Sequence, residues 1–403
     1  MSGLTHRLRA GVALPFGAAL AMLPAALAEA QTTRLIVDGQ AGVGYSTNPF
    51  LVTGDDAGSA FTELSITPQL VRLDEKGEAA LSAYYRRTDY FTRYDSADSY
   101  GVEARARRQL SQTFNAHAVV SYDSSIIGQS SYGLVGVLDP ALPPDLGTPD
   151  IALLGLRQRQ KSLSAAIGGD LRVSQRDTVN GELRANRISY ADNGILTSST
   201  TKSATLGWSH AVSARTSVGL QGSGSWSNFD RDRTSGAFYQ PQVTVNHQFS
   251  SSVTVSAALG ALFITSRTPL GTVHSTGISG NVFACKAGQR SNTCFRAYSD
   301  AQPTGFGDVS KRQGAGLDYS YQVRENDVVR ASVDYSRVQE TSNLLQARNA
   351  SFITGGASYE HGFSRRLFGG VAGGYRRASG GGRDWPSDLN VKIFVRARWG
   401  DTQ

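Results

Sequence analysis

Apolar and polar residues alternate strictly along much of this chain. The clearest case is the segment from Leu389 to Trp399. One set of alternating positions there holds Val391, Ile393, Val395, Ala397 and Trp399, and the other holds Lys392, Phe394, Arg396 and Arg398. Side chains alternate between the two faces of a strand. The segment therefore predicts a β-strand with one apolar wall and one cationic wall.

The same pattern repeats between short turns that share their chemistry. Seven such turns are Asp74–Gly77, Ser111–Thr113, Ser174–Asp177, Ser213–Thr216, Ser250–Ser252, Arg324–Asp327 and Ser364–Arg366. Most successive turns lie about 37 to 40 residues apart, which fits two strands and one longer loop. Seven turns imply fourteen strands, and an opening strand (Leu35 to Tyr45) and the closing one give about sixteen. The predicted fold is all-β: a single antiparallel transmembrane β-barrel with short periplasmic turns and longer extracellular loops.

The N-terminal segment predicts export from the cytoplasm. Arg7 and Arg9 precede an apolar run from Val12 to Leu27, and small residues follow in Ala26–Ala28 and Ala28–Ala30. This is the pattern of a secretory signal peptide, which we assign to residues 1–30, with the barrel at 31–403. No later stretch approaches the ~20 consecutive apolar residues of a membrane helix. The predicted location is the cell outer membrane.

Aromatic residues and prolines add detail to the predicted strands. Two belts are expected at the two membrane interfaces. The outer belt comprises Tyr45, Tyr122, Tyr190, Trp226, Tyr335, Tyr359 and Tyr375, and the inner one Phe114, Phe249, Phe363 and Trp399. Pro68 and Pro241 fall inside predicted strands, where we expect a bulge or an interrupted ladder, because proline has no N–H to donate.

Two long outer loops are expected. The first, Ser124 to Gln158, could fold inward and narrow the pore or lie outside as a cap. The second, Thr268 to Gly307, contains both cysteines of the chain, Cys285 and Cys294. In an oxidising periplasm these two predict a disulfide, which we expect to pin the tip of the outer loop. No histidine lies beside them, so no metal site is expected.

The end of the first strand carries a family resemblance, in Gly44-Tyr45-Ser46-Thr47-Asn48-Pro49-Phe50. An early Tyr-x-x-Asn-x-Phe followed by serial hairpins resembles the porin-type outer-membrane β-barrels encoded with bacterial exopolysaccharide biosynthesis and export clusters. The resemblance implies passage or secretion of surface polysaccharide across the outer membrane. It supplies no catalytic residues. The chain departs from many outer-membrane proteins in placing Gly400–Gln403 after its last aromatic residue.

Charged residues of the polar faces are the candidate functional residues. Strand parity predicts that these line a pore: Arg86, Arg105, Arg107, Arg172, Arg184, Arg330, Arg376, Lys392, Arg396, Arg398, Glu103, Glu182, Asp318 and Asp334. Asp123, Asp170 and Glu360 have the same parity. The charges could select solutes, or they could neutralise one another across neighbouring strands and brace the wall. A plugged lumen is a further possibility.

These features together favour transport over chemistry. We expect a weakly anion-favouring pore for exopolysaccharide or another polar glycan; the alternatives are a nutrient-uptake porin and a non-conducting structural barrel. The expected partners are outer-membrane lipid, a polysaccharide and periplasmic export components. The formal net charge of +7 would permit nucleic-acid binding, but the cations form no basic tract. Neither an enzyme nor a cofactor is expected, because no nucleophile–base–acid set or ligand spacing is present.

Overall fold

The computed structural model describes residues 32–52, 57–127, 157–191, 196–230, 234–269, 271–340, 350–380 and 387–400. All regular structure in these ranges is β-strand. The strands are β1 (Thr32–Ser46), β2 (Ser59–Asp74), β3 (Gly77–Tyr90), β4 (Ala97–Gln109), β5 (Phe114–Ile126), β6 (Arg159–Arg172), β7 (Asp177–Tyr190), β8 (Ser199–Ser213), β9 (Thr216–Phe229), β10 (Ser235–Ser250), β11 (Val253–Thr268), β12 (Gly271–Ala287), β13 (Ser291–Pro303), β14 (Val309–Arg324), β15 (Asp327–Glu340), β16 (Ala350–Gly362), β17 (Leu367–Gly380) and β18 (Ser387–Gly400).

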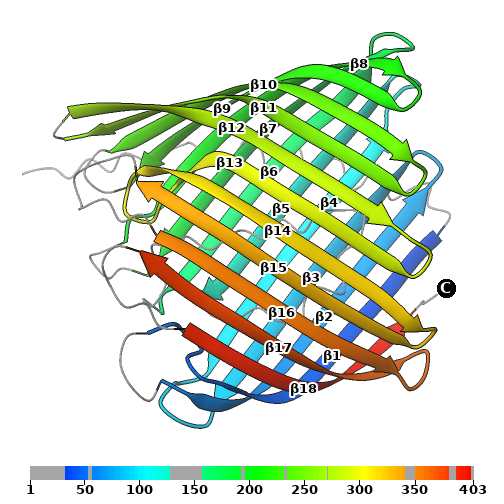
Figure 1. Ribbon diagram of the computed structural model, residues 1–403, viewed down its shortest axis with the longest axis vertical. Helices are drawn as coiled ribbons and strands as arrows, with labels where there is room; N and C mark the ends of the chain where they lie inside the picture. Colours follow the sequence, from blue (N-terminus) through cyan, green and yellow to red (C-terminus); the bar gives the residue numbers. More distant parts are fainter. Residues whose placement is uncertain are drawn as a thin grey trace, which may run out of the picture.

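The strands form one closed antiparallel barrel (Figure 1). Each strand pairs with its neighbours in sequence, and β1 also pairs with β18, from Ile36↔Gly400 to Ser46↔Asn390. Closure leaves no edge strand at the chain ends, which is what a sheet in lipid requires. Short turns lie at one end of the barrel and longer connections at the other, except that only residues 269 and 270 separate β11 from β12. By the rule for such barrels, the short turns are periplasmic.

The predicted count of about sixteen strands was too low. The structure has eighteen, because the segment expected to be one long outer loop, Thr268 to Gly307, contains β12 and β13. Their periplasmic turn at Gly288, where Gly288 N–H donates to Ser291 O, was the one missed from the sequence. The outward positions Thr272, His274 and Thr276 of β12 are polar. The alternation that revealed the other strands is therefore absent from its first half.

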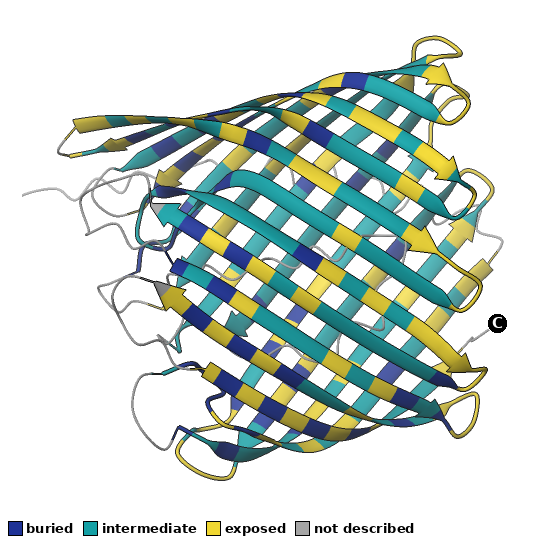
Figure 2. Cartoon of the chain, in the orientation of Figure 1, coloured by how far each residue is buried: buried dark blue, intermediate teal, exposed yellow. Residues whose placement is uncertain are grey.

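The outside of the barrel is apolar and the inside is polar. Exposed outward side chains around the wall include Val43, Leu64, Leu81, Val102, Leu183, Leu206, Leu220, Val243, Leu259, Ile278, Phe295, Val333, Ile353, Val371 and Ile393. Along β18 exposed and buried residues alternate without a break from Ser387 to Val395, as the banding in Figure 2 shows. A continuous apolar exterior on a closed barrel places the protein in the outer membrane.

No helix in the described ranges could cross a membrane. The predicted signal peptide at 1–30 lies outside those ranges. So does most of the first long loop, including the part for which inward folding was considered.

The prediction of interrupted ladders at the two prolines is confirmed. Pro68 pairs with Val37 of β1, but the β2–β3 ladder passes from Ile66↔Tyr85 to Gln69↔Ser82 without it. Pro241 likewise pairs with β9, while the β10–β11 ladder omits it. Register is kept across both gaps. At the second gap, a Cβ on Gly260 would lie 1.8 Å from the Pro241 carbonyl oxygen, so only glycine fits opposite this proline.

The aromatic belts are present, with two corrections. Trp226, Tyr239 and Phe263 lie at the outer end of β9–β11, where the indole N–H of Trp226 donates to the Tyr239 hydroxyl at 3.0 Å. Tyr359 belongs to the periplasmic end, since its hydroxyl donates to Asp327 beside a short turn. Tyr190 faces inward and packs against the buried pair of Ile127 and Leu196.

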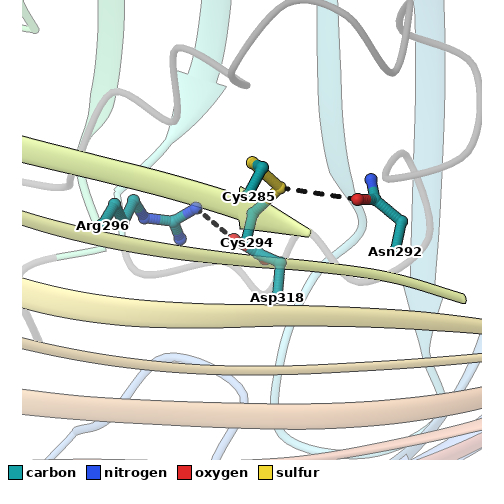
Figure 3. The surroundings of a disulfide bond; sticks show 5 residues. All are labelled: Cys285, Asn292, Cys294, Arg296 and Asp318. Carbon is teal, nitrogen blue, oxygen red and sulfur yellow. Dashed lines mark hydrogen bonds and ion pairs between the residues drawn. A yellow bond between two sulfur atoms is a disulfide. The ribbon is translucent and has the colours of Figure 1, made fainter. Parts of the chain in front are cut away.

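Cys285 and Cys294 form a disulfide with an S–S distance of 2.05 Å (Figure 3). The expectation that it would pin an outer loop was wrong. The two residues are a cross-strand pair of β12 and β13, close to the periplasmic turn. The error follows from the missed turn, since an unrecognised hairpin between two long strands looks like a loop.

A charge on the outer face should destabilise the barrel far more than the same charge one residue away on the inner face. Leu206 lies at the middle of β8, points outward and is 66% exposed, so Leu206→Arg should reduce the free energy of unfolding by about 2–4 kcal/mol. Thr205→Arg, which points into the lumen, is the matched control. Guanidinium titrations in lipid vesicles, followed by tryptophan fluorescence, measure both. Equal costs would contradict the assignment of faces.

Removal of the disulfide should weaken one hairpin and leave the barrel folded. Cys285→Ser with Cys294→Ser loses a cross-link worth about 2–3 kcal/mol by loop entropy. We expect faster hydrogen exchange in β12 and β13, with unchanged exchange in the β1–β18 seam. Mass-resolved exchange in nanodiscs provides the measurement. A variant that fails to form a barrel would contradict a local role.

Candidate functional site

The lumen is lined by the inward positions of the eighteen strands. All fourteen charged residues predicted to line it lie on inward positions, including Arg107 opposite Glu78 and Arg184 opposite Ala166. Their burial divides them into two groups. Those near the closing seam are covered and paired, whereas those of β4, β6 and β7 are more accessible. A role in solute passage stays a prediction for all of them.

The closing seam is joined by a network of five charged residues. Arg396 donates to Glu360 at 2.7 Å and to Asp38 at 3.0 Å, and Arg398 also donates to Asp38 at 3.0 Å. Arg330 lies 3.9 Å from Glu360. Asp38 and Glu360 are both buried. The network thus connects β1, β15, β16 and β18 through side chains as well as through the backbone.

A second set of ion pairs lies nearer the extracellular end of the seam. Asp388 is fully buried and accepts hydrogen bonds from Arg376 at 2.8 Å and from the Ser46 hydroxyl at 2.6 Å. Lys392 donates to Glu63 at 2.7 Å, and both are buried. These cations face the lumen but are covered and paired with carboxylates, and their role in bracing the wall stays a prediction.

The segment after β1, which carries the Tyr-x-x-Asn-x-Phe motif, turns into the barrel. The Asn48 side chain closes the turn, accepting from Val52 N–H at 2.9 Å and donating to Val52 O at 2.8 Å. Arg376 donates to Pro49 O at 3.1 Å. Leu51 has a left-handed backbone (φ 53°), a strained conformation for leucine. Its side chain is buried against the inner wall of β15–β17, which offsets that strain.

Aromatic rings hold the other side of this segment. Phe50 is fully buried, with ring centroids 5.4 Å from Tyr90 and 5.0 Å from Tyr94. The Arg157 guanidinium lies 4.8 Å from the centre of the Phe50 ring. Burial raises the pKa of the Tyr94 hydroxyl, so that ring stays neutral. The motif therefore builds a fixed inward segment that narrows the extracellular mouth.

Sequence reasoning missed several lumen charges of β13 and β14. Arg296 joins two predicted residues, donating to Asp318 at 2.5 Å and to Asp334 at 2.6 Å (the Asp318 contact is drawn in Figure 3). Arg312 pairs with Asp300 at 2.7 Å. Arg296 and Asp300 were overlooked because β13 was taken for loop. The parity rule would have found them once the turn at Gly288 was recognised.

The accessible charges lie on β4, β6 and β7. Arg105 is 3.4 Å from Glu78, and Glu182 contacts both Arg184 and His117. The side chains of Arg107 and Arg172 have no hydrogen bond or ion pair with any described residue. Two predicted residues remain. Glu103 lies on the same face of β4, and Arg86 of β3 is buried, with Nε and Nη1 lacking a hydrogen-bond partner among the described residues. This sector presents accessible charges to the lumen.

The opposite wall, formed by β8–β12, is uncharged on its inner face throughout the described positions. It presents hydroxyl and amide groups instead: Thr201, Ser203, Thr205, Ser217, Gln221, Ser223, Gln240, Gln242, Thr244, Thr254, Ser256, Ser279 and Asn281. Some of these groups bond to each other, as Ser223 does to Gln240 and Gln242 to Ser279. The lumen thus has an ionic side and a neutral polar side.

The connection between β13 and β14 crosses the extracellular mouth. Gly305 O accepts from Thr197 N–H at 2.7 Å, and Phe306 packs with Leu196 and Ile127. Thr197 and Leu196 precede β8, and Ile127 follows β5, so the connection reaches a distant part of the wall. Together with the inward segment after β1 it narrows the entrance.

No group of three or more potential metal ligands occurs in the described part of the chain. The histidines there are each held separately by neighbouring side chains. His361, for example, bonds to Asp327 at 2.6 Å and His247 to Thr216 at 2.8 Å. These contacts hold the described histidines apart from one another.

The sequence matches no protein-family model and no curated protein. Solved structures with a similar course include the FrpB iron transporter from Neisseria meningitidis (F3-3 variant), at 9% identity and a TM-score of 0.48. That match covers 89% of this chain and 63% of the transporter, so the chain spans less than two thirds of its length.

Two further structures are similar to this chain over nearly their whole length. Pseudomonas aeruginosa OccK2 (OpdF) has 10% identity, a TM-score of 0.46 and coverage of 92% of this chain and 99% of that one. A BenF-like porin from Pseudomonas fluorescens Pf-5 has 10% identity, a TM-score of 0.46 and coverage of 92% and 100%. At this level of similarity these likenesses carry no argument about function.

Loss of Arg396 should destabilise the closing seam strongly. Arg396→Ala leaves the buried Glu360 with only Arg330 at 3.9 Å and the buried Asp38 with Arg398 alone among the described cations, at a cost of about 3–5 kcal/mol in the free energy of unfolding. Arg87→Ala removes an exposed arginine 3.0 Å from Asp89 and should leave stability nearly unchanged. Unfolding titrations in vesicles compare the two. Similar small effects would mean that the seam network contributes little.

Proposed function

We propose that this protein is a passive outer-membrane pore for small polar solutes, of the nutrient-uptake kind. The observation that carries the proposal is the division of the lumen into an ion-paired wall and an uncharged hydroxyl and amide wall. Barrels of sixteen to eighteen strands are wide enough for an aqueous channel. Hydroxyl and amide groups exchange hydrogen bonds readily with sugars and other polar molecules.

The charges of the lumen favour weak selectivity. The seam cations are matched by carboxylates within hydrogen-bonding distance, so they contribute little net field to the channel. The accessible Arg105, Arg107, Arg172 and Arg184 are equalled in number by Glu78, Glu103, Asp170 and Glu182. Little preference between anions and cations is therefore expected.

The narrowed entrance supports small solutes over a polymer. Two inward segments, residues 47–52 and 303–308, occupy part of the extracellular mouth. The passage of exopolysaccharide, expected from the sequence resemblance, stays a prediction without support in the described residues. A pore alone sets no direction of transport, so uptake here follows the external solute gradient.

Reversal of two accessible charges should change ion selectivity. The variant Arg105→Glu with Arg107→Glu should shift the reversal potential in a salt gradient from near zero to a clearly cation-selective value, because both side chains face the channel. Planar bilayer recordings measure the shift. The control is Arg176→Glu with Arg215→Glu, which carries the same change of charge in two periplasmic turns.

Liposome swelling with neutral sugars of increasing size tests the substrate class. Monosaccharides should enter at rates that the charge reversals leave unchanged. A wild-type protein without conductance or swelling activity would refute the pore. Strong cation selectivity in the wild type would refute only the charge argument.

A further inference from the structure

The ladder between β12 and β13 stops halfway up the wall. It comprises eight residue pairs, from Gly280↔Ser299 to Ala287↔Asn292, and is the shortest ladder of the barrel as far as the structure describes it. β12 continues to Gly271 paired only with β11, while β13 continues to Pro303 paired only with β14. Figure 1 shows β9–β12 extending beyond β13 at the extracellular end. The wall is therefore split above Gly280.

The split leaves backbone groups of β12 unpaired. The Ser299 hydroxyl donates to Ile278 O at 2.7 Å, which shows that the even-numbered residues of β12 direct their backbone toward β13. The backbone N–H and C=O groups of Thr272, His274 and Thr276 point the same way, and they have no backbone partner among the described residues. Unpaired strand edges are rare in barrels, because closure normally removes them.

The split reaches into the outer leaflet. Thr276 of β12 lies level with Phe263 of the outer aromatic belt. Gly280, where pairing begins, is four residues nearer the periplasm, which is about 10 Å along the membrane normal for a tilted strand. The exposed Ile278 and Leu259 beside it face lipid. The opening between the two strands thus adjoins acyl chains as well as head groups.

An apolar patch lies behind the split, inside an otherwise polar wall. Phe238, Leu262 and Ile264 are on inward positions of β10 and β11, and they are covered by Ala301 and Val309 from the ends of β13 and β14. We call these ends, residues 300–311 with their connection, the inward hairpin. Apolar residues on the inner wall contribute nothing to the passage of polar solutes. A molecule with an acyl chain could bind to them if the inward hairpin moved.

The ammonium group of Lys311 lies at the split. A Cβ on Gly277 of β12 would lie 2.9 Å from the Lys311 ammonium, so this glycine leaves room for the lysine at the split. The Lys311 ammonium has no hydrogen bond or ion pair with a described residue. Asp308 Oδ2 and Ser310 Oγ on the inward hairpin are buried without partners, which disfavours the closed arrangement. The Ser266 hydroxyl donates to Asp308 at 2.8 Å and Thr197 N–H donates to Gly305 O at 2.7 Å, and opening must break both bonds.

We propose that the split between β12 and β13 is a lateral port for an anionic amphiphile, with the inward hairpin as its door. The acyl chain passes between the outer leaflet and the apolar patch, and Lys311 pairs with the carboxylate or phosphate head. The disulfide between Cys285 and Cys294 lies at the periplasmic end of the same short ladder. It limits the opening to the outer half of the wall. The proposal is independent of ion conduction through the barrel axis.

A disulfide lock on the door tests the port. An ideal Cβ at Gly236 lies 3.5 Å from Val309 Cβ, within the range of disulfides. Gly236→Cys with Val309→Cys, in a Cys285→Ser, Cys294→Ser background, can be compared oxidised and reduced in lipid nanodiscs. The probe is a diazirine-labelled dodecanoate, and the labelled peptides are mapped by mass spectrometry. The reduced protein should be labelled at Phe238, Leu262 or Ile264, and oxidation should abolish this labelling while labelling at Leu259 and Ile278 persists.

Two controls separate the port from simple anchoring of a loop. Gly42→Cys with Phe394→Cys, whose Cβ positions lie 3.3 Å apart, locks the continuously paired β1–β18 seam and should leave labelling unchanged. Lys311→Gln should reduce labelling by dodecanoate but not by the corresponding dodecanol. A diazirine-labelled phospholipid in the nanodisc shows whether membrane lipid enters by the same route. Inner-face labelling that is absent in the reduced protein, or equal in both redox states, would overturn the proposal.

Discussion

The fold depends on one constraint, that a backbone group facing hydrocarbon must find its partner within the protein. Pairing of β1 with β18 meets it for the chain as a whole. At a few ladder positions the backbone pairing is interrupted, and each interruption is compensated in a different way. Pro68 and Pro241 interrupt one ladder each but lack the N–H that would need a partner, and Gly260 lets the strands stay in register. At the split above Gly280, a serine hydroxyl takes the place of the first missing backbone donor.

Closure also decides where the charges go. A strand that meets lipid on one face must place its polar residues on the other, so the lumen collects arginines and carboxylates from β1–β7 and β13–β18. Near the seam they are close enough to neutralise one another, and the network around Asp38 and Asp388 contributes to holding the first and last strands together. The neutral wall of β8–β12 needs no such pairing. Its hydroxyl and amide groups remain available for water and solutes.

Sequence alone predicted the barrel, the faces and seven of the turns, because strict alternation leaves little doubt about the orientation of a two-faced strand. It failed at β12, where Thr272, His274 and Thr276 are polar on the outer face. Because the alternation is missing there, the hairpin of β12 and β13 was not predicted, the predicted strand count was too low, and the disulfide was predicted on the wrong side of the membrane. The inward segments, residues 47–52 and 303–308, could not be predicted from the sequence for another reason. The burial of Phe50 and Leu51 depends on Tyr90, Tyr94 and Phe352, which are distant in sequence and carry no local signal.

The position of the disulfide bears on how the barrel is assembled. Cys285 and Cys294 are nine positions apart, so the ring can close in the unfolded chain as soon as it meets an oxidising compartment. β12 and β13 would then reach the membrane already joined in register. The pair of strands with the fewest backbone bonds is thus the pair whose association requires no search at the membrane. If hairpins are added to the growing sheet one after another, the hairpin of β12 and β13 is already joined by its disulfide when it is added.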